Sequence, residues 1–269
     1  MEKLSLTQEW DKVFPKNDKV DHKKVTFHNR YGITLAADMF TPKSVVGKLP
    51  AIAVSGPFGA VKEQSSGLYA QKMTEYGFLT IAFDPSFTGE SGGSPRYVAS
   101  PDINTEDFCA AVDFLSVQEN IDTDRIGIIG ICGWGGMAIN AAAQDTRIKA
   151  TAAMTMYDMT RVNANGYFDN ENTPEARFAK KLAMNTQRTE DYKNGSYVYL
   201  DIALTCGHEF VHKGCSLAHS GVSRGRLRHD IKKSLRTKRA KGRSYLYRGT
   251  TQLPVGRSFL RLPQTLSGM

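Results

Sequence analysis

The chain has 269 residues, of which 41% are hydrophobic and 23% are charged, the proportions of a globular protein with room for one large domain or two small ones. Its net charge of +8 is unevenly spread, because residues 201–269 hold 14 Lys and Arg against 3 Asp and Glu, which leaves 21 basic and 24 acidic residues in the rest of the chain. The apolar runs are only strand-length and the N-terminal stretch MEKLSLTQEWDKVF is charged, so we expect neither a membrane span nor a signal peptide.

Alternating apolar and polar residues on both sides of Arg30-Tyr31-Gly32 predict a β-hairpin over residues 24–41. Short apolar runs predict four buried strands, at residues 49–55, 78–83, 125–131 and 148–156. Helical periodicity predicts helices at residues 63–76, 105–119, 135–144 and 174–185. Strands and helices that alternate in this way form right-handed crossovers, so we expect an α/β fold with a largely parallel sheet and helices on both faces.

The strand and helix pattern ends near residue 198 and divides the chain into three parts. Residues 1–24 are predicted to be an N-terminal extension, residues 25–197 the α/β core, and residues 198–269 a basic, atypical tail. Because the tail is rich in Arg, Lys, Ser, Leu and Gly and poor in acids, one hypothesis is that it is translated in a shifted reading frame, and another is that it is disordered. Either origin would leave the α/β fold incomplete at its C-terminus.

The four cysteines are irregularly spaced, which indicates free thiols in a reducing compartment, and we therefore expect a cytoplasmic protein. One of them, Cys132, stands among glycines where a predicted strand meets a predicted helix, in the stretch GICGWGG of residues 130–136. A nucleophile on such a turn needs small neighbours, because the turn forces strained backbone angles. The helix N-terminus behind the turn would favour the thiolate and offer backbone N–H groups to an oxyanion. The alternative is a structural cysteine, since a free thiol is often a small buried hydrophobe.

The order of several segments resembles the α/β-hydrolase superfamily, specifically its dienelactone-hydrolase-like branch with a cysteine nucleophile and its Xaa-Pro dipeptidyl-peptidase-like relatives. Residues 55–60 (SGPFGA) resemble the oxyanion loop after the third strand, and residues 83–91 (FDPSFTGES) the loop after the fourth. The GICGWGG stretch follows as the nucleophile elbow, and residues 155–159 (TMYDM) end the next strand. The resemblance covers about residues 25–185. Trp134 departs from the strict motif, which has glycine at that position, although some relatives place the small residue one position later.

The resemblance implies a role for individual residues. Cys132 would be the attacking thiolate, and the backbone N–H of Gly133 would hold the oxyanion together with an N–H from the loop after the third strand. Phe58 is the favoured second donor, because the neighbouring Pro57 has no N–H. Asp84 and Asp158 end strands and are candidate acids, but we expect both to cap or brace loops instead.

The acid and the histidine of that superfamily follow the nucleophile on later strands, and neither can be assigned here. The histidines after Cys132 all lie beyond the last clear strand, at His208, His212, His219 and His229. A thiolate nucleophile needs a base, so the chain is expected to be inactive if these groups are lost.

Two other functions are suggested by the tail. The sequence HEFVH at residues 208–212 matches the H-E-x-x-H zinc signature of metallopeptidases, although Gly207 and Gly214 would weaken its helix. The same region could instead form a small structural zinc site from Cys206, His208, His212 and Cys215. The basic run at residues 224–243 could bind nucleic-acid phosphates, but it lacks interleaved aromatic residues.

The expected function is hydrolysis of a carboxylic ester, lactone or related acyl compound through Cys132, with a small-molecule substrate. We expect no cofactor, no bound metal, no membrane partner and no specific nucleic acid, and the sequence leaves the oligomeric state open. A zinc metallopeptidase and a nucleic-acid-binding protein are the alternative functions.

Overall fold

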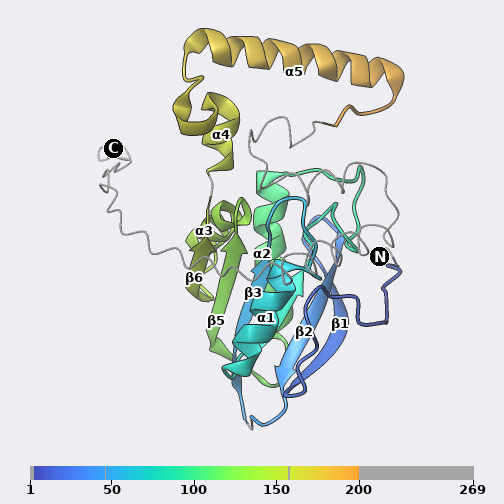
Figure 1. Ribbon diagram of the computed structural model, residues 1–269, viewed down its shortest axis with the longest axis vertical. Helices are drawn as coiled ribbons and strands as arrows, with labels where there is room; N and C mark the ends of the chain where they lie inside the picture. Colours follow the sequence, from blue (N-terminus) through green and yellow to red (C-terminus); the bar gives the residue numbers. More distant parts are fainter. Residues whose placement is uncertain (1–2, 46, 157, 200–269) are drawn as a thin grey trace, which may run out of the picture.

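The computed structural model describes residues 3–45, 47–156 and 158–199 (Figure 1). Within these residues, six strands form one sheet in the order β1-β2-β4-β3-β5-β6. The strands are β1 (Val20–His28), β2 (Thr34–Pro42), β3 (Leu49–Ser55), β4 (Leu79–Phe83), β5 (Ile121–Ile131) and β6 (Ile148–Met154). β4, β3, β5 and β6 run parallel, whereas β1 and β2 form the predicted hairpin and join the sheet antiparallel to β4. The prediction of a largely parallel sheet is confirmed.

Helices cover both faces of this sheet, as the alternating pattern predicts. α1 (Ser65–Glu75) packs on β3 and β4 on one face, and α2 (Pro101–Ser116) and α3 (Trp134–Gln144) pack on β5 and β6 and on each other on the opposite face (Figure 1). The two hydrophobic clusters follow this division. In β3, Ala51 and Ala53 belong to the cluster beneath α2 and α3, whereas Ile52 and Val54 belong to the cluster beneath α1. Because successive side chains of a strand point to opposite faces, an all-apolar run such as LPAIAVS serves both cores at once.

Helix ends differ from the predicted ones where a local cap decides them. α2 begins at Pro101 because the Ser100 side chain accepts a hydrogen bond from the Ile103 N–H and proline suits the first helical position. α5 (Pro174–Asn194) begins at the predicted proline, with Thr173 as its N-cap, but continues well beyond residue 185. It ends where Gly195 adopts the left-handed conformation, with φ of 61°.

The N-terminal segment packs on the core rather than standing apart from it. β1 begins at Val20, so the boundary predicted at residue 24 falls inside a strand. Phe14 is buried in the cluster beneath α1, and the charged side chains of Asp11 and Lys12 are buried as well. The three-part division of the chain remains a prediction, but residues 11–20 contribute to the same core as α1.

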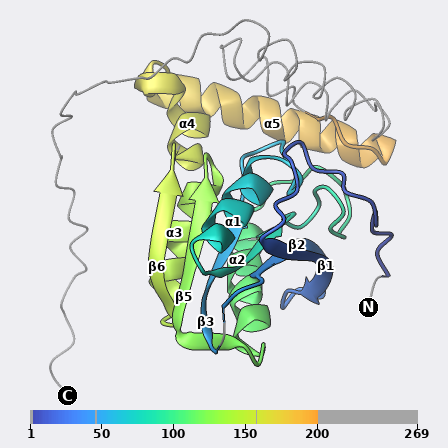
Figure 2. The ribbon, with the colours of Figure 1, turned by 60° about the horizontal axis from the view of Figure 1, so that its bottom comes forward.

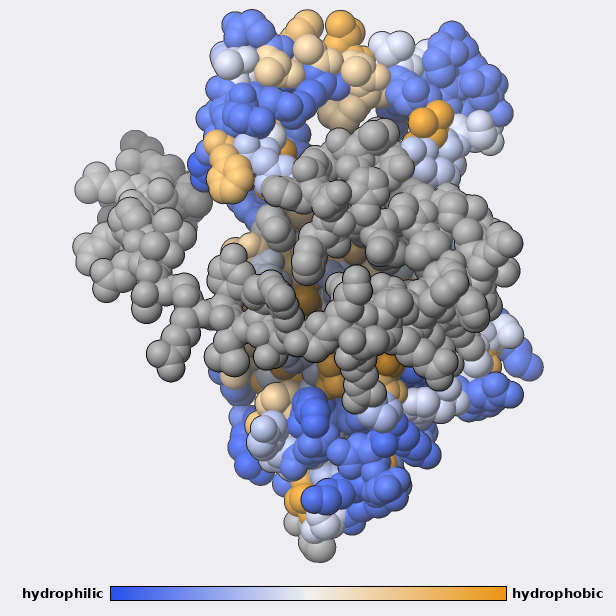
Figure 3. Space-filling view, viewed as in Figure 1, coloured by the Kyte–Doolittle hydropathy of each residue, from blue (hydrophilic) through white to orange (hydrophobic). Residues whose placement is uncertain are grey.

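After β6 the chain forms an arm at the carboxyl end of the parallel strands. The arm consists of α4 (Met159–Asn165), the short helix η1 (Tyr167–Asp169) and α5 (Figure 2). None of the residues in these three helices is fully buried, and Phe178 and Leu182 are exposed. The face of the arm that Figure 3 shows is mainly hydrophilic. No helix among the described residues is both long enough and apolar enough to cross a membrane.

Candidate active site

Cys132 lies at the turn between β5 and α3 that the sequence predicts. Its φ of 59° is in the left-handed region, which residues with a side chain rarely adopt. The thiol side chain is half-buried, and the backbone N–H donates to the Met154 carbonyl at the end of β6 over 2.8 Å. A strained backbone at a strand-to-helix turn is the geometry of a nucleophile elbow.

The glycines around the turn are required by close packing. A Cβ added at Gly130 would lie 2.3 Å from the Trp134 carbonyl oxygen and 2.8 Å from the Ala138 Cβ. A Cβ added at Gly135 would lie 2.9 Å from Met156 Cγ in the segment after β6. Gly135 is therefore the small residue that lets the next strand approach, and it replaces the glycine that the strict motif has one position earlier.

Trp134 has a role of its own, which accounts for the departure from the motif. Its side chain is only 4% exposed and its ring stacks on Phe58, with centroids 4.9 Å apart and an interplanar angle of 14°. The same ring closes over Gly56, where an added Cβ would lie 2.4 Å from it. Since stacked aromatic pairs stabilise beyond the area they bury, Trp134 holds the loop after β3 against the elbow.

The two predicted oxyanion donors belong to segments in direct contact. The loop after β3 turns on Gly56 and Gly59, whose φ values are 100° and 71°. Its Phe58 ring lies so close to the elbow that a Cβ added at Gly133 would be 2.1 Å from Phe58 Cε2. The structure therefore brings Cys132, Gly133 and Phe58 together at the carboxyl end of the sheet.

The two strand-ending aspartates brace loops, as the sequence analysis expects. Both carboxylate oxygens of buried Asp84 accept backbone N–H groups, from Lys62 over 2.7 Å and from Glu90 over 2.8 Å. Asp158 is the N-cap of α4 and accepts from the Arg161 N–H over 3.0 Å. Both carboxylates therefore stabilise local backbone, Asp84 between two loops and Asp158 at a helix start.

Neither histidine among the described residues lies near the elbow. The described part of the chain contains two histidines, His22 and His28, and both are on β1, which three strands separate from β5. His22 forms a 2.8 Å contact with Asp38 instead. The four candidate histidines, His208, His212, His219 and His229, lie outside the described residues, as do the HEFVH sequence, Cys206, Cys215 and the basic run at residues 224–243.

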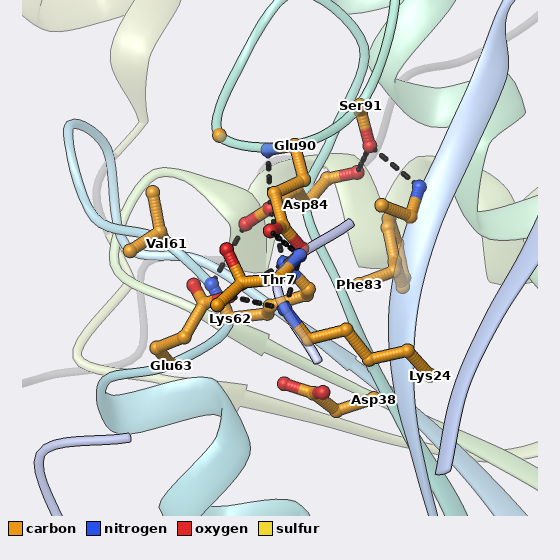
Figure 4. A network of polar contacts seen from close by, with 12 residues as sticks. Thr7, Lys24, Asp38, Val61, Lys62, Glu63, Phe83, Asp84, Glu90 and Ser91 are labelled. Atoms are coloured by element: carbon orange, nitrogen blue, oxygen red, sulfur yellow. Dashed lines mark hydrogen bonds and ion pairs between the residues drawn. The ribbon is translucent and has the colours of Figure 1, made fainter. Parts of the chain in front are cut away.

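The sequence did not predict that Lys62, near the end of the loop after β3, is buried. The Lys62 ammonium lies within 3 Å of carboxylate oxygens of Glu63, Asp84 and Glu90, and its side chain is 0% exposed (Figure 4). Burial alone would lower the pKa of Lys62, but the charges of Asp84 and Glu63 hold that pKa well above its ordinary value. A Lys-Glu pair at the start of a helix is usually solvated, and nothing in a single sequence marks this one as buried.

The only three-carboxylate group that could hold a metal ion among the described residues consists of Asp11, Glu63 and Glu90. The Lys24 ammonium already contacts all three, at 3.4 Å from Asp11, 3.4 Å from Glu63 and 2.6 Å from Glu90. An ammonium therefore takes the place that a cation would need, and these acids are ion-pair partners.

Comparison with known proteins places this site in a family. The sequence model of the X-Pro dipeptidyl-peptidase (S15) family matches residues 31–206, which is more than half of the chain. The chain belongs to the S15 family. The match includes the loop after β3, the elbow at Cys132 and the arm, and it confirms the family resemblance that these segments carry, although it does not identify the nucleophile.

Relatives of the S15-family chain agree with the fold. It is 63% identical over 197 residues to the uncharacterized protein PA2218 of Pseudomonas aeruginosa. The matched residues make up 73% of this chain and 53% of PA2218. The crystal structure of PA2218 superposes with a TM-score of 0.73 over 75% of this chain and 63% of that chain. The α/β hydrolase GrgF of Penicillium sp. is 22% identical with a TM-score of 0.58, over 82% of this chain and 67% of that one, and shows the same fold.

One of the more distant relatives has a name that states an enzymatic activity. The thiohydrolase aneE of Aspergillus aculeatus is 32% identical over 133 residues, which is 49% of this chain and 41% of that protein. The chain thus spans about half the length of the curated relatives PA2218 and aneE.

Proposed function

We propose that this protein is a hydrolase that cleaves a carboxylic ester, lactone, thioester or related acyl compound through a covalent intermediate on Cys132. The observation that carries the proposal is the strained, half-buried cysteine at the β5–α3 turn, in contact range of the loop that would supply the second oxyanion donor. The S15 family and the thiohydrolase relative support acyl chemistry at this turn.

The chemistry follows from the three residues. The Cys132 sulfur bonds to the acyl carbon while the carbonyl electron pair moves onto oxygen, and the N–H groups of Gly133 and Phe58 stabilise that oxyanion. The bond to the leaving alcohol or thiol then breaks, and the thiol proton is transferred to the leaving group through a base or solvent. Water hydrolyses the thioester, which releases the acid and restores the thiol.

A burst experiment tests this assignment. An activated ester such as p-nitrophenyl acetate should release a burst of nitrophenolate that is stoichiometric with enzyme, and C132A should abolish it. Cys109→Ala is the matched control, because Cys109 is the other cysteine among the described residues and lies on α2. An undiminished burst in C132A would refute the assignment.

Chelation separates the zinc alternative. A thiol hydrolase has no metal in its reaction, so EDTA should leave the burst and any turnover unchanged. Loss of activity with EDTA and recovery with Zn²⁺ would instead favour the HEFVH sequence at residues 208–212.

A further inference from the structure

The far end of the loop after β3 is anchored by a buried lysine, Lys62. Its ammonium donates to Glu63 Oε1 over 2.6 Å, to Asp84 Oδ2 over 2.9 Å and to Glu90 Oε2 over 2.8 Å (Figure 4). Its backbone N–H also donates to Asp84 Oδ1 over 2.7 Å. Main chain and side chain of Lys62 are therefore both fixed by Asp84, the first residue after β4.

Asp84 extends this attachment to the loop after β4. Its Oδ2 accepts the Glu90 N–H, and its backbone carbonyl accepts the Ser91 hydroxyl over 2.6 Å. Gly89 packs so tightly here that an added Cβ would lie 2.2 Å from Asp84 Oδ2. Two loops at the same end of the sheet are thus locked to one carboxylate.

The outer side of the cluster is closed by β1 and the N-terminal segment. Lys24 of β1 donates to Glu90 Oε2 over 2.6 Å, and the Thr7 N–H donates to Glu90 Oε1 over 2.8 Å. Lys24 lies on a strand and reaches Asp11, Glu63 and Glu90, so it closes the cluster from the side of β1. Lys24 and Lys62 both contact Glu63 and Glu90. Lys62 also contacts Asp84, whereas Lys24 also contacts Asp11.

We propose that Lys62 is the positioning residue of the oxyanion hole: with Asp84 it fixes the far end of the loop whose Phe58 N–H would face the acyl oxygen on Cys132. This inference rests on the proposed function. Phe58 stacks on Trp134 at the near end of the loop, and Lys62 is anchored four residues later. Between them lie Gly59 and the tight turn in which the Ala60 N–H donates to the Pro57 carbonyl. Without the anchor the loop could keep its stacked ring while its N–H groups lose their direction.

Two reactions at the Cys132 sulfur distinguish a misplaced oxyanion hole from a general change in the reactivity of the thiol. Acylation by p-nitrophenyl acetate passes through an oxyanion and needs the hole. Alkylation by iodoacetamide displaces iodide at carbon and forms no oxyanion. The ratio of the two rate constants at Cys132 therefore reports the oxyanion hole and cancels changes in exposure or reactivity of the thiol.

The variants are K62M, D84N and K24M, with folding checked by circular dichroism. K62M removes the ammonium at similar length, and D84N keeps the shape of the side chain but places an amide against its donors. Both should lower the ratio by tenfold or more, since loss of one oxyanion donor lowers rates by about a hundredfold to a thousandfold. K24M removes an ammonium from the same cluster and should leave the ratio within about twofold of the wild-type value.

Each other outcome overturns the proposal. An unchanged ratio in folded K62M or D84N would show that the loop needs no such anchor. An equal fall in K24M would make Lys62 one of several structural charges, and failure of both K62M and D84N to fold would show that the cluster serves the fold alone. Absence of acylation at Cys132 in the wild-type protein would refute the proposed function itself, and this inference with it.

Discussion

At the residue scale, the elbow combines features that a local motif can predict with one that it cannot. The need for glycine at Gly130 and a small residue near Gly135 follows from the turn itself, and the structure confirms both. The role of Trp134 could not be predicted, because its stacking partner Phe58 belongs to a loop far earlier in the chain. What looks like a departure from the motif is a contact between two loops.

The contact between Gly133 and Phe58 leads to a first prediction. G133A should lower the free energy of unfolding by about 1–3 kcal/mol, because its methyl group meets the Phe58 ring while the helical φ at this position permits alanine. Chemical denaturation measures the loss. The double variant G133A/F58L should lose less than the two single losses combined, and strict additivity would contradict the contact.

The second prediction concerns the other described thiol. Burial, followed by the charge of Glu106, raises the pKa of Cys109 to about 11. Because only the thiolate reacts, about 0.1% of this thiol is reactive at pH 8. Iodoacetamide labelling of Cys109, followed by peptide mass spectrometry, should accelerate about tenfold per pH unit from pH 7 to 10. A plateau near pH 9 would contradict the shift.

At the element scale, strands and helices follow the hydrophobic pattern, whereas the contacts between loops do not. The apolar runs identify β3, β4, β5 and β6, and the largest differences for α2 and α5 are at the ends set by Ser100 and Gly195. The buried charges around Lys62 could not be predicted, since their meeting depends on which loops the sheet order places side by side. Charged residues are read as exposed unless a partner is known.

The third prediction is an acid-dependent loss of stability through Glu90. Burial would raise the pKa of Glu90, but the ammonium of Lys62 and hydrogen bonds from Lys24 and Lys62 hold that pKa well below its usual range. A carboxyl with a lowered folded pKa stabilises the protein above its unfolded pKa of about 4.3, and this contribution is lost as the pH falls further. Glu63 acts in the opposite sense, because burial and the charge of Asp84 raise its pKa.

Urea denaturation between pH 3 and pH 7 measures this dependence. E90Q should be less stable than the wild type at pH 7, by about 3–5 kcal/mol if its lysine partners are left buried and uncompensated. The difference should shrink as the pH falls below about 4, because Glu90 then binds a proton in the unfolded wild-type chain but not in the folded one. The exposed Glu119→Gln is the matched control. A difference between E90Q and wild type that does not vary with pH would contradict the assignment.

At the scale of the whole molecule, the described residues form the sheet, the elbow and the arm of an S15-family protein. Fold class, nucleophile candidate and oxyanion loop could be predicted because each depends on a short segment and its order in the chain. The acid and the histidine could not, because the superfamily places them on later strands and the candidate histidines lie in residues 200–269, outside the described part. The family match ends at residue 206, near the position where the predicted basic tail begins.

The central claim is that Cys132 is an acyl-accepting nucleophile, and direct mapping of the acyl group tests it. After brief incubation with p-nitrophenyl acetate and an acid quench, peptide mass spectrometry should find one acetyl group, on the peptide that contains Cys132. Hydroxylamine at neutral pH should remove it, because a thioester is labile to that reagent and an acetylated lysine is not. Acetyl groups confined to Cys109 or to lysines, with the Cys132 peptide unmodified, would contradict the account.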